Sequence, residues 1–162
     1  MTGVLPAQAI RGMIDAGAIT AHPAVIAAQV QPASLDLRLG TKAYRVRASF
    51  LAGAGRKVSA RLEEFTMHEV DLTKGAVLEK GCVYVIPLME SLALPAGLSA
   101  VANAKSSTGR LDLLTRTITD GGAEFDRIPE GYEGPLYAEV CPRSFSVLVR
   151  AGQRLNQIRF RY

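Results

Sequence analysis

The sequence is poor in the residues that build disulfide scaffolds and zinc sites. Its 162 residues include two cysteines and two histidines, and no CxxC pair is present. Two cysteines cannot form a disulfide framework, and a His/Cys zinc cluster cannot be assembled within one chain. The zinc-dependent nucleobase deaminases are therefore excluded, because they need an HxE and a PCxxC motif. Free thiols are typical of proteins in the reducing cytoplasm, where we expect this chain to reside.

Long apolar runs and dense blocks of charge are missing as well. No stretch of about 18 apolar residues is present, and the N-terminus lacks the features of a signal peptide, so we expect no membrane association. The formal net charge is +4, but Lys and Arg do not form the blocks that mark nucleic-acid-binding tails, and we expect no nucleic-acid partner. The charge weakly favours anionic ligands, although a solvated basic surface is its commoner cause.

The composition that remains is that of an ordinary globular protein, with 48% hydrophobic and 21% charged residues. A chain of this length corresponds to one domain that can bury a substantial core without disulfides or metals. No internal repeat, linker or low-complexity segment divides the sequence. We therefore expect residues 1–162 to form a single domain.

The hydrophobic pattern predicts one helix followed by many short strands. Apolar residues at helical spacing, a proline in the first turn and Gly17 as a stop predict a helix over residues 5–17. In residues 34–39 leucines alternate with polar residues, which predicts a half-buried strand. Asp36 and Arg38 share its polar face, where they can form ion pairs across the sheet.

Further strands are predicted where short apolar segments lie between turns that contain glycine or proline. They cover residues 43–48, 70–72, 76–78, 82–88, 98–102, 113–118, 136–141, 145–149 and 155–160. Many short strands at close spacing favour an all-β barrel or a jelly-roll-like sandwich. The glycines of residues 52–57 (AGAGRK) predict a flexible loop.

Three segments carry groups that can do chemistry. Residues 105–110 (KSSTGR) combine cations, hydroxyls and a glycine, which can either cradle phosphate oxygens or form a polar turn, and the Walker A pattern is absent. Glu139 is the only carboxylate in the apolar segment 135–141, which makes it a candidate general base, although an exposed strand glutamate is commoner. Residues 124–132 carry three carboxylates and Tyr132, which can contact a sugar and a base or belong to a plain surface loop.

Taken in order along the chain, four blocks resemble the dCTP deaminase branch of the dUTPase-like superfamily, over residues 4–160. They are residues 31–40 (QPASLDLRLG), 105–113 (KSSTGRLDL), 126–140 (DRIPEGYEGPLYAEV) and 152–160 (GQRLNQIRF). The resemblance implies a mainly β fold, a distorted antiparallel barrel of the jelly-roll-like β-clip type with one N-terminal helix. It also implies a homotrimer or pseudo-trimer whose active sites are shared between neighbouring subunits.

The same resemblance implies an activity and a set of site residues. The reaction is the hydrolysis of dCTP to dUTP and ammonia without zinc, in dUMP and dTTP biosynthesis; Mg²⁺ enters with the triphosphate, and dTTP is a candidate inhibitor. By motif match, Glu139 is the general base and Arg110, from an adjacent subunit, lies beside it. Motif match further implies that the substrate is bound by Lys105, Ser106, Ser107, Thr119, Asp126, Tyr132 and Gln157.

Several positions depart from the family pattern. Lys105 stands where the family has arginine, Tyr132 stands where it has tryptophan, and segment 120–125 is longer than in the family. The basic, glycine-rich C-terminal segment of the family does not follow Tyr162. The opening TGVLPAQAI and the ending QIRFRY resemble the first module of a two-module member, so we expect the chain to be one module of a longer protein.

Two alternative functions remain open at this point. The same fold supports dUTP diphosphatases and bifunctional deaminase–diphosphatases, and it can also serve as a nucleotide-binding or assembly module without turnover. Glu139 in its apolar strand favours deamination, because a diphosphatase does not need that base. Binding of dCTP or dTTP without product formation would instead indicate a non-catalytic module.

Overall fold

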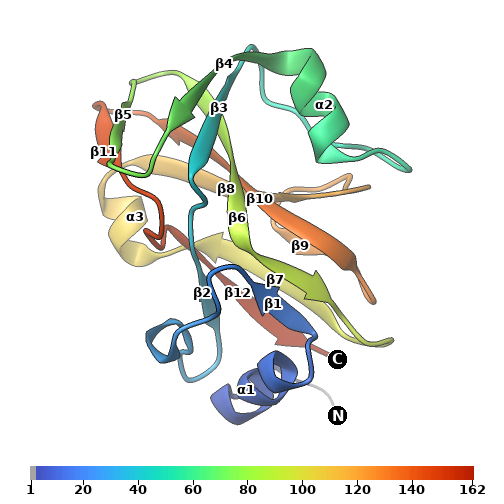
Figure 1. Cartoon of the computed structure of the whole chain (residues 1–162). Coiled ribbons are helices and arrows are strands. Elements are labelled where there is room, and N and C mark those ends of the chain that lie inside the picture. The colour runs from blue at the N-terminus through green and yellow to red at the C-terminus, as the bar shows by residue number, and fades with distance from the viewer. Residues whose placement is uncertain (1–2) are drawn as a thin grey trace.

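The computed structural model describes residues 3–162 as a mainly antiparallel β structure with short helices at its edges (Figure 1). The helices are α1 (Ala7–Asp15), α2 (Val58–Phe65), α3 (Ser106–Arg110) and the single 3-10 turn η1 (Ala27–Gln29). No helix within residues 3–162 has the length and apolar character needed to cross a membrane.

Three sheets contain the strands. The six-stranded sheet runs in the order β4 (Thr66–Asp71), β3 (Lys42–Val46), β6 (Val83–Ala93), β10 (Glu133–Pro142) and β8 (Leu113–Thr119), and β1 (Ile19–Ala21) also pairs with β6. The four-stranded sheet runs in the order β2 (Leu35–Leu37), β12 (Asn156–Arg161), β7 (Ser99–Ala104) and β9 (Arg127–Ile128). The two-stranded sheet pairs β11 (Val147–Val149) with β5 (Ala76–Leu78).

Alternate residues of β6 and β10 point to opposite faces of the six-stranded sheet and enter two different apolar clusters. Ile86 and Ala138 face the main core, which also contains Leu37 of β2 and Phe160 of β12. The main core thus fills the space between the six-stranded and four-stranded sheets. Burial of such side chains stabilises the fold by about 25 cal/mol for each square ångström of apolar surface removed from water.

The second apolar cluster lies on the other face of the six-stranded sheet. Val85, Ile118 and Tyr137 line that face, and the connection between β3 and α2 covers it with Phe50. Phe50 stacks on Phe65 of α2 with ring centroids 5.2 Å apart. The connection between β3 and α2 therefore shields the middle of β10 from solvent on that face.

The predicted fold class is confirmed, but several sequence-based elements need correction. Strands β1 and β9 were not predicted, and β4 covers Thr66–Asp71 rather than residues 70–72. The helix expected over residues 5–17 is α1, confined to Ala7–Asp15. Two further helices, α2 and α3, were not predicted, although Val58 and Leu62 of α2 have the helical spacing of a buried face. Residues 52–57, expected as a loop, form no regular element apart from a turn.

The expectation of a half-buried strand at residues 34–39 is wrong. All three residues of β2 are buried, including Asp36, which is 0% exposed. Asp36 and Arg38 can be buried because each forms an ion pair with another segment, as expected from their position on the polar face. Arg38 binds Glu90 of β6 through Nε–Oε2 at 2.8 Å, and Asp36 binds Lys105.

Candidate active site

Glu139 lies in the middle of β10, and its neighbours on the adjacent strands are fixed by register. Val85 of β6 is opposite Glu139 on one side, and Arg116 of β8 is opposite it on the other. All three residues are on the face that carries the second apolar cluster. Glu139 is 2% exposed, so the commoner alternative of an exposed strand glutamate is wrong for this chain.

Both oxygens of the buried carboxylate have a partner. Arg116 Nη2 lies 2.8 Å from Glu139 Oε1, and the Ser49 hydroxyl donates to Oε2 at 2.8 Å. Arg116 Nη2 also donates to the Ser49 hydroxyl oxygen at 3.2 Å. The guanidinium carbon of Arg116 lies 3.7 Å from the centre of the Phe125 ring, which is the geometry of a cation–π contact. We call Glu139, Arg116, Ser49 and Phe125 the Glu139 cluster.

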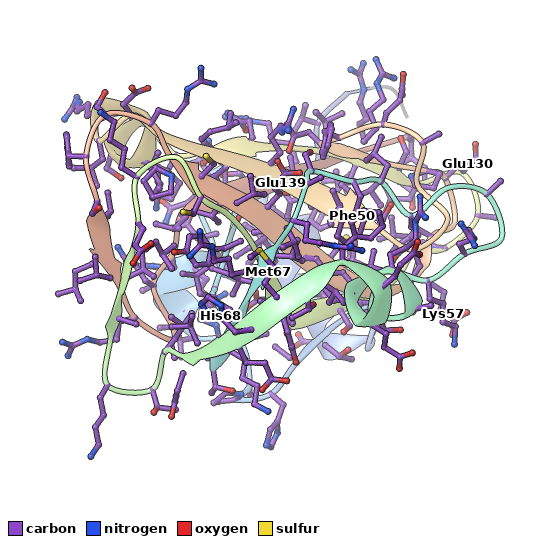
Figure 2. All side chains as sticks on the ribbon, turned by 90° about the horizontal axis from the view of Figure 1, so that it is seen from above. Phe50, Lys57, Met67, His68, Glu130 and Glu139 are labelled. Carbon is purple, nitrogen blue, oxygen red and sulfur yellow. The ribbon has the colours of Figure 1, made fainter. Side chains whose placement is uncertain are left out.

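The Glu139 cluster gathers segments that are distant in the sequence. Ser49 comes from the connection between β3 and α2, and Phe125 comes from the connection between β8 and β9. Figure 2 looks onto this covered face, with Glu139 on β10 near the middle of the view and Phe50 on the connection that passes over it. The Glu139 carboxylate is therefore shielded from bulk water and has a hydrogen-bond donor on each oxygen.

Asp126 lies next to the Glu139 cluster and is tightly held. Its backbone has a left-handed conformation (φ 64°), which Asp adopts more readily than most residues. Asp126 Oδ1 accepts a hydrogen bond from the Thr117 backbone N–H at 2.7 Å, and the Asp126 N–H donates to the Thr117 carbonyl at 2.8 Å. Burial raises the pKa of the Asp126 carboxyl above its ordinary value, while the Thr117 hydrogen bond and the charge of Arg116 oppose that rise.

Thr119 and Tyr132, both expected to bind substrate, are buried in the same hairpin region. The Thr119 hydroxyl is buried and has no hydrogen-bond partner within residues 3–162. The Tyr132 hydroxyl donates to the Pro135 carbonyl at 2.6 Å and accepts from the Asp120 N–H at 3.1 Å, and burial raises the pKa of Tyr132 to about 12. In this chain the phenol therefore ties the two arms of the hairpin together.

The second group of expected site residues surrounds Asp36 on the four-stranded sheet. Lys105 Nζ lies 2.5 Å from Asp36 Oδ2, and Arg154 Nη1 lies 3.6 Å from the same oxygen. Gln157 is opposite Asp36 in the pairing of β12 with β2. We call Asp36, Lys105, Arg154 and Gln157 the Asp36 cluster. It presents two partly exposed cations around one buried carboxylate, which leaves positive charge available to an anionic ligand.

Helix α3 carries the remaining candidates. Ser106, Ser107 and Arg110 are exposed on it, and the Thr108 hydroxyl fixes the helix by donating to the Leu155 carbonyl at 2.7 Å. Within residues 3–162, Arg110 makes no ion pair, and the cation beside Glu139 is Arg116. The role expected for Arg110, beside Glu139 from an adjacent subunit, is not tested by a single chain and stays a prediction.

Arg116, Ser49 and Phe125 were not predicted to lie in the Glu139 cluster. The alternation of β8 places Arg116 on one face with Ile118, but only the register between β8 and β10 reveals that Glu139 is opposite. Ser49 and Phe125 belong to irregular connections, for which neither periodicity nor spacing predicts a partner. No pattern in the sequence indicated that Arg154 would share Asp36 with Lys105.

Known proteins resemble this chain over most or all of its length. Residues 1–162 match the family model described as the 2'-deoxycytidine 5'-triphosphate deaminase (DCD) N-terminal domain. A dCTP deaminase of Haemophilus influenzae is 30% identical over 138 residues, which cover 80% of this chain and 67% of the relative.

The comparison with solved structures agrees with the sequence comparison. The crystal structure of 2'-deoxycytidine 5'-triphosphate deaminase from Agrobacterium tumefaciens superposes with a TM-score of 0.97 and 61% sequence identity. The match covers 99% of this chain and 48% of the Agrobacterium chain, so this chain spans about half the length of that protein. The chain therefore belongs to the family of 2'-deoxycytidine 5'-triphosphate deaminase N-terminal domains.

Proposed function

We propose that this domain takes part in the hydrolytic deamination of dCTP, supplied as its magnesium complex, to dUTP and ammonia. The observation that carries the proposal is the state of Glu139. It is a buried carboxylate with one donor on each oxygen, Arg116 at 2.8 Å and Ser49 at 2.8 Å. A diphosphatase has no need of such a group at this place, whereas attack of water on a pyrimidine ring requires a base.

The chemical steps can be written around that carboxylate. Glu139 takes a proton from water while the water oxygen bonds to C4 of cytosine, and the proton passes to N3. Glu139 then takes the proton of the new C4 hydroxyl and delivers it to the 4-amino group. The C4–N4 bond breaks, ammonia leaves, and C4 becomes the carbonyl carbon of uracil. Fixed dipoles and exact placement lower the barrier in this scheme.

The other candidate residues bind the nucleotide in this proposal. Lys105, Ser106, Ser107 and Gln157 contact the triphosphate, in keeping with the excess of positive charge in the Asp36 cluster. Asp126 contacts the deoxyribose or the base, and Thr119 has a free hydroxyl for the same purpose. Tyr132 acts indirectly, because both hydrogen bonds of its hydroxyl hold the hairpin on which Asp126 lies.

We further propose that complete sites form between copies of this domain in a homotrimer or pseudo-trimer, with Arg110 reaching Glu139 of a neighbour. Within one chain the Glu139 cluster belongs to the six-stranded sheet and the Asp36 cluster to the four-stranded sheet. No hydrogen bond or ion pair joins the two clusters within residues 3–162. This separation supports a site to which two copies contribute different parts, and a second module of a longer chain can supply the partner.

The remaining parts of the proposal concern zinc, location and regulation. Zinc has no role in the scheme, since the chain has two histidines and two cysteines and the steps above use Glu139 alone as the base. The free thiols of Cys82 and Cys141 support a cytoplasmic location. dTTP, the end product that follows from dUTP, is proposed as an inhibitor that competes for the same pyrimidine site.

The products formed from dCTP test the proposed function. Purified protein, treated with EDTA to remove zinc and then supplied with Mg²⁺, is incubated with dCTP, and the nucleotides are separated by chromatography. Equal amounts of dUTP and ammonia support deamination. Formation of dUMP and pyrophosphate from added dUTP would show the diphosphatase or bifunctional alternative. Binding of dCTP without any product would overturn catalysis by this domain and favour the non-catalytic module.

A further inference from the structure

We propose that Arg116 is the positioning residue for Glu139, acting within the same chain. This inference rests on the proposed function, because it assigns which of the two Glu139 carboxylate oxygens takes the proton from water. Arg116 fixes Oε1 of the carboxylate, and the attacking water is then received by Oε2, whose partner is the exchangeable hydroxyl of Ser49. Arg116 is a contact of Glu139 within its own chain, in addition to the Arg110 of a neighbouring subunit that the proposed function brings to the same carboxylate.

The register of the sheet makes the contact between Arg116 and Glu139 a rigid one. The two residues are directly opposite on β8 and β10, where cross-strand side chains have Cβ atoms about 5 Å apart. An ionic hydrogen bond of 2.8 Å between them is strong and directional, and Glu139 is buried. The backbone of two paired strands therefore sets the position of Oε1, and no loop has to close to place it.

Phe125 holds the guanidinium from the other side. The Arg116 carbon Cζ lies 3.7 Å from the centre of the Phe125 ring, so the guanidinium lies against the ring. Phe125 immediately precedes Asp126, whose carboxylate is bound to the Thr117 N–H on the same strand as Arg116. Movement of the hairpin that carries Asp126 is thereby coupled to the orientation of the Arg116 guanidinium.

The two oxygens of Glu139 differ in how firmly they are held. Oε1 is bound by a charged, stacked guanidinium, whereas Oε2 is bound by the Ser49 hydroxyl from an irregular connection. A hydroxyl rotates freely about its C–O bond, and the Ser49 oxygen also accepts a hydrogen bond from Arg116 Nη2 at 3.2 Å, so Ser49 keeps a partner when its proton turns away from Oε2. Water can take the place of the serine hydroxyl on Oε2 without loss of the Arg116 contact.

The inference is tested with the variants Arg116→Gln and Arg116→Lys in the dCTP deamination assay. Arg127→Gln is the matched control, since within residues 3–162 the Arg127 side chain forms an ion pair with Glu124 alone, and that pair is exposed. A misplaced general base costs about 100-fold in rate, so we expect Arg116→Gln to lower kcat by about that factor with KM changed less than about threefold. Arg116→Lys keeps the charge and is expected to recover about tenfold of that loss.

A spectroscopic signature separates positioning from simple destabilisation. The Nη–H proton of Arg116, held by Glu139, is expected to give a slowly exchanging NMR signal that disappears in Glu139→Gln and persists in Arg127→Gln. Melting temperatures are measured for every variant, and kcat is compared well below each of them. A fall in activity that follows the loss of folded protein, with the arginine signal unchanged in Glu139→Gln, would overturn the inference.

The outcomes also separate this inference from the proposed function. If the wild-type protein does not deaminate dCTP, the proposed function fails and the role of Arg116 in it fails with it. If the wild-type protein deaminates dCTP and Arg116→Gln keeps kcat within about twofold, only the present inference fails. A loss confined to KM in Arg116→Gln would assign Arg116 to substrate binding and would likewise overturn its role as positioning residue.

Discussion

Asp36 and Lys105, 69 residues apart in the sequence, are joined by an ion pair in which Lys105 Nζ lies 2.5 Å from Asp36 Oδ2. The pair ties β2 to the residue directly before α3, so the serines of α3 are anchored to the four-stranded sheet. Asp36 is fully buried, while about a quarter of the Lys105 side chain (26%) remains exposed. The lysine thus keeps contact with solvent and can serve both Asp36 and a phosphate.

Asp36→Asn tests whether this ion pair positions residues 105–110, the segment proposed to bind the nucleotide. Loss of the buried charge leaves Lys105 and Arg154 without their shared anion, and we expect the free energy of unfolding to fall by about 2 kcal/mol. The fall is smaller than for a fully buried pair because both cations are partly solvated. We also expect the KM for dCTP to rise several-fold with little change in kcat. Chemical denaturation and steady-state kinetics measure the two effects.

The control for Asp36→Asn is Glu69→Gln, which breaks the exposed ion pair with Lys42. Exposed pairs contribute less than about 1 kcal/mol, so this variant should differ little from wild type in stability or KM. Equal effects of the two substitutions would contradict a special role for the buried pair.

Tyr132→Phe tests whether Tyr132 acts through the hairpin or touches the substrate. The substitution leaves the Pro135 carbonyl and the Asp120 N–H without their phenol partner, and an unpaired buried polar group costs about 1–3 kcal/mol. We expect a lower melting temperature and a change in kcat below about threefold at temperatures where the variant is folded. A large loss of dCTP affinity without loss of stability would show direct contact with the nucleotide instead.

Asp126→Asn tests whether burial raises the pKa of the Asp126 carboxyl in the folded protein. Burial raises the pKa of Asp126 above its ordinary value of 3.8, so ionisation is more costly in the folded state than in the unfolded state. The stability of wild type relative to Asp126→Asn is therefore highest below pH 3.8 and falls as the pH rises through the folded-state pKa. Urea unfolding of both proteins across that window measures the difference. A difference that grows with rising pH would contradict the raised pKa.

Most strands and the main candidate site residues could be predicted from local patterns in the sequence. Glu139 became a candidate because one carboxylate interrupts an apolar segment, and Lys105 became one because cations and hydroxyls are close together in the sequence; their roles came from the family resemblance and stay predictions. Burial on both faces was not predictable for β2, because alternation alone cannot show that a second layer covers Asp36. Arg116 required the pairing of β8 with β10, and that pairing depends on contacts between residues distant in the sequence.

The missed helices have a similar explanation. The spacing of Val58 and Leu62 indicates about one turn of an apolar helix face, but the segment follows a glycine-rich stretch and is too short to be stable alone. Its stability comes from the second apolar cluster, in which Phe65 stacks on Phe50. The cover over Glu139 therefore depends on packing that no local pattern encodes.

The most direct test of the account compares ammonia release from magnesium dCTP by wild-type protein and by Glu139→Gln, with dCTP binding measured for both. Glutamine has the size of glutamate and cannot take a proton from water, so we expect at least about a 100-fold loss of turnover with binding retained. That result would support Glu139 as the base. Turnover by Glu139→Gln within a few-fold of wild type would contradict the central claim that this buried carboxylate carries the reaction.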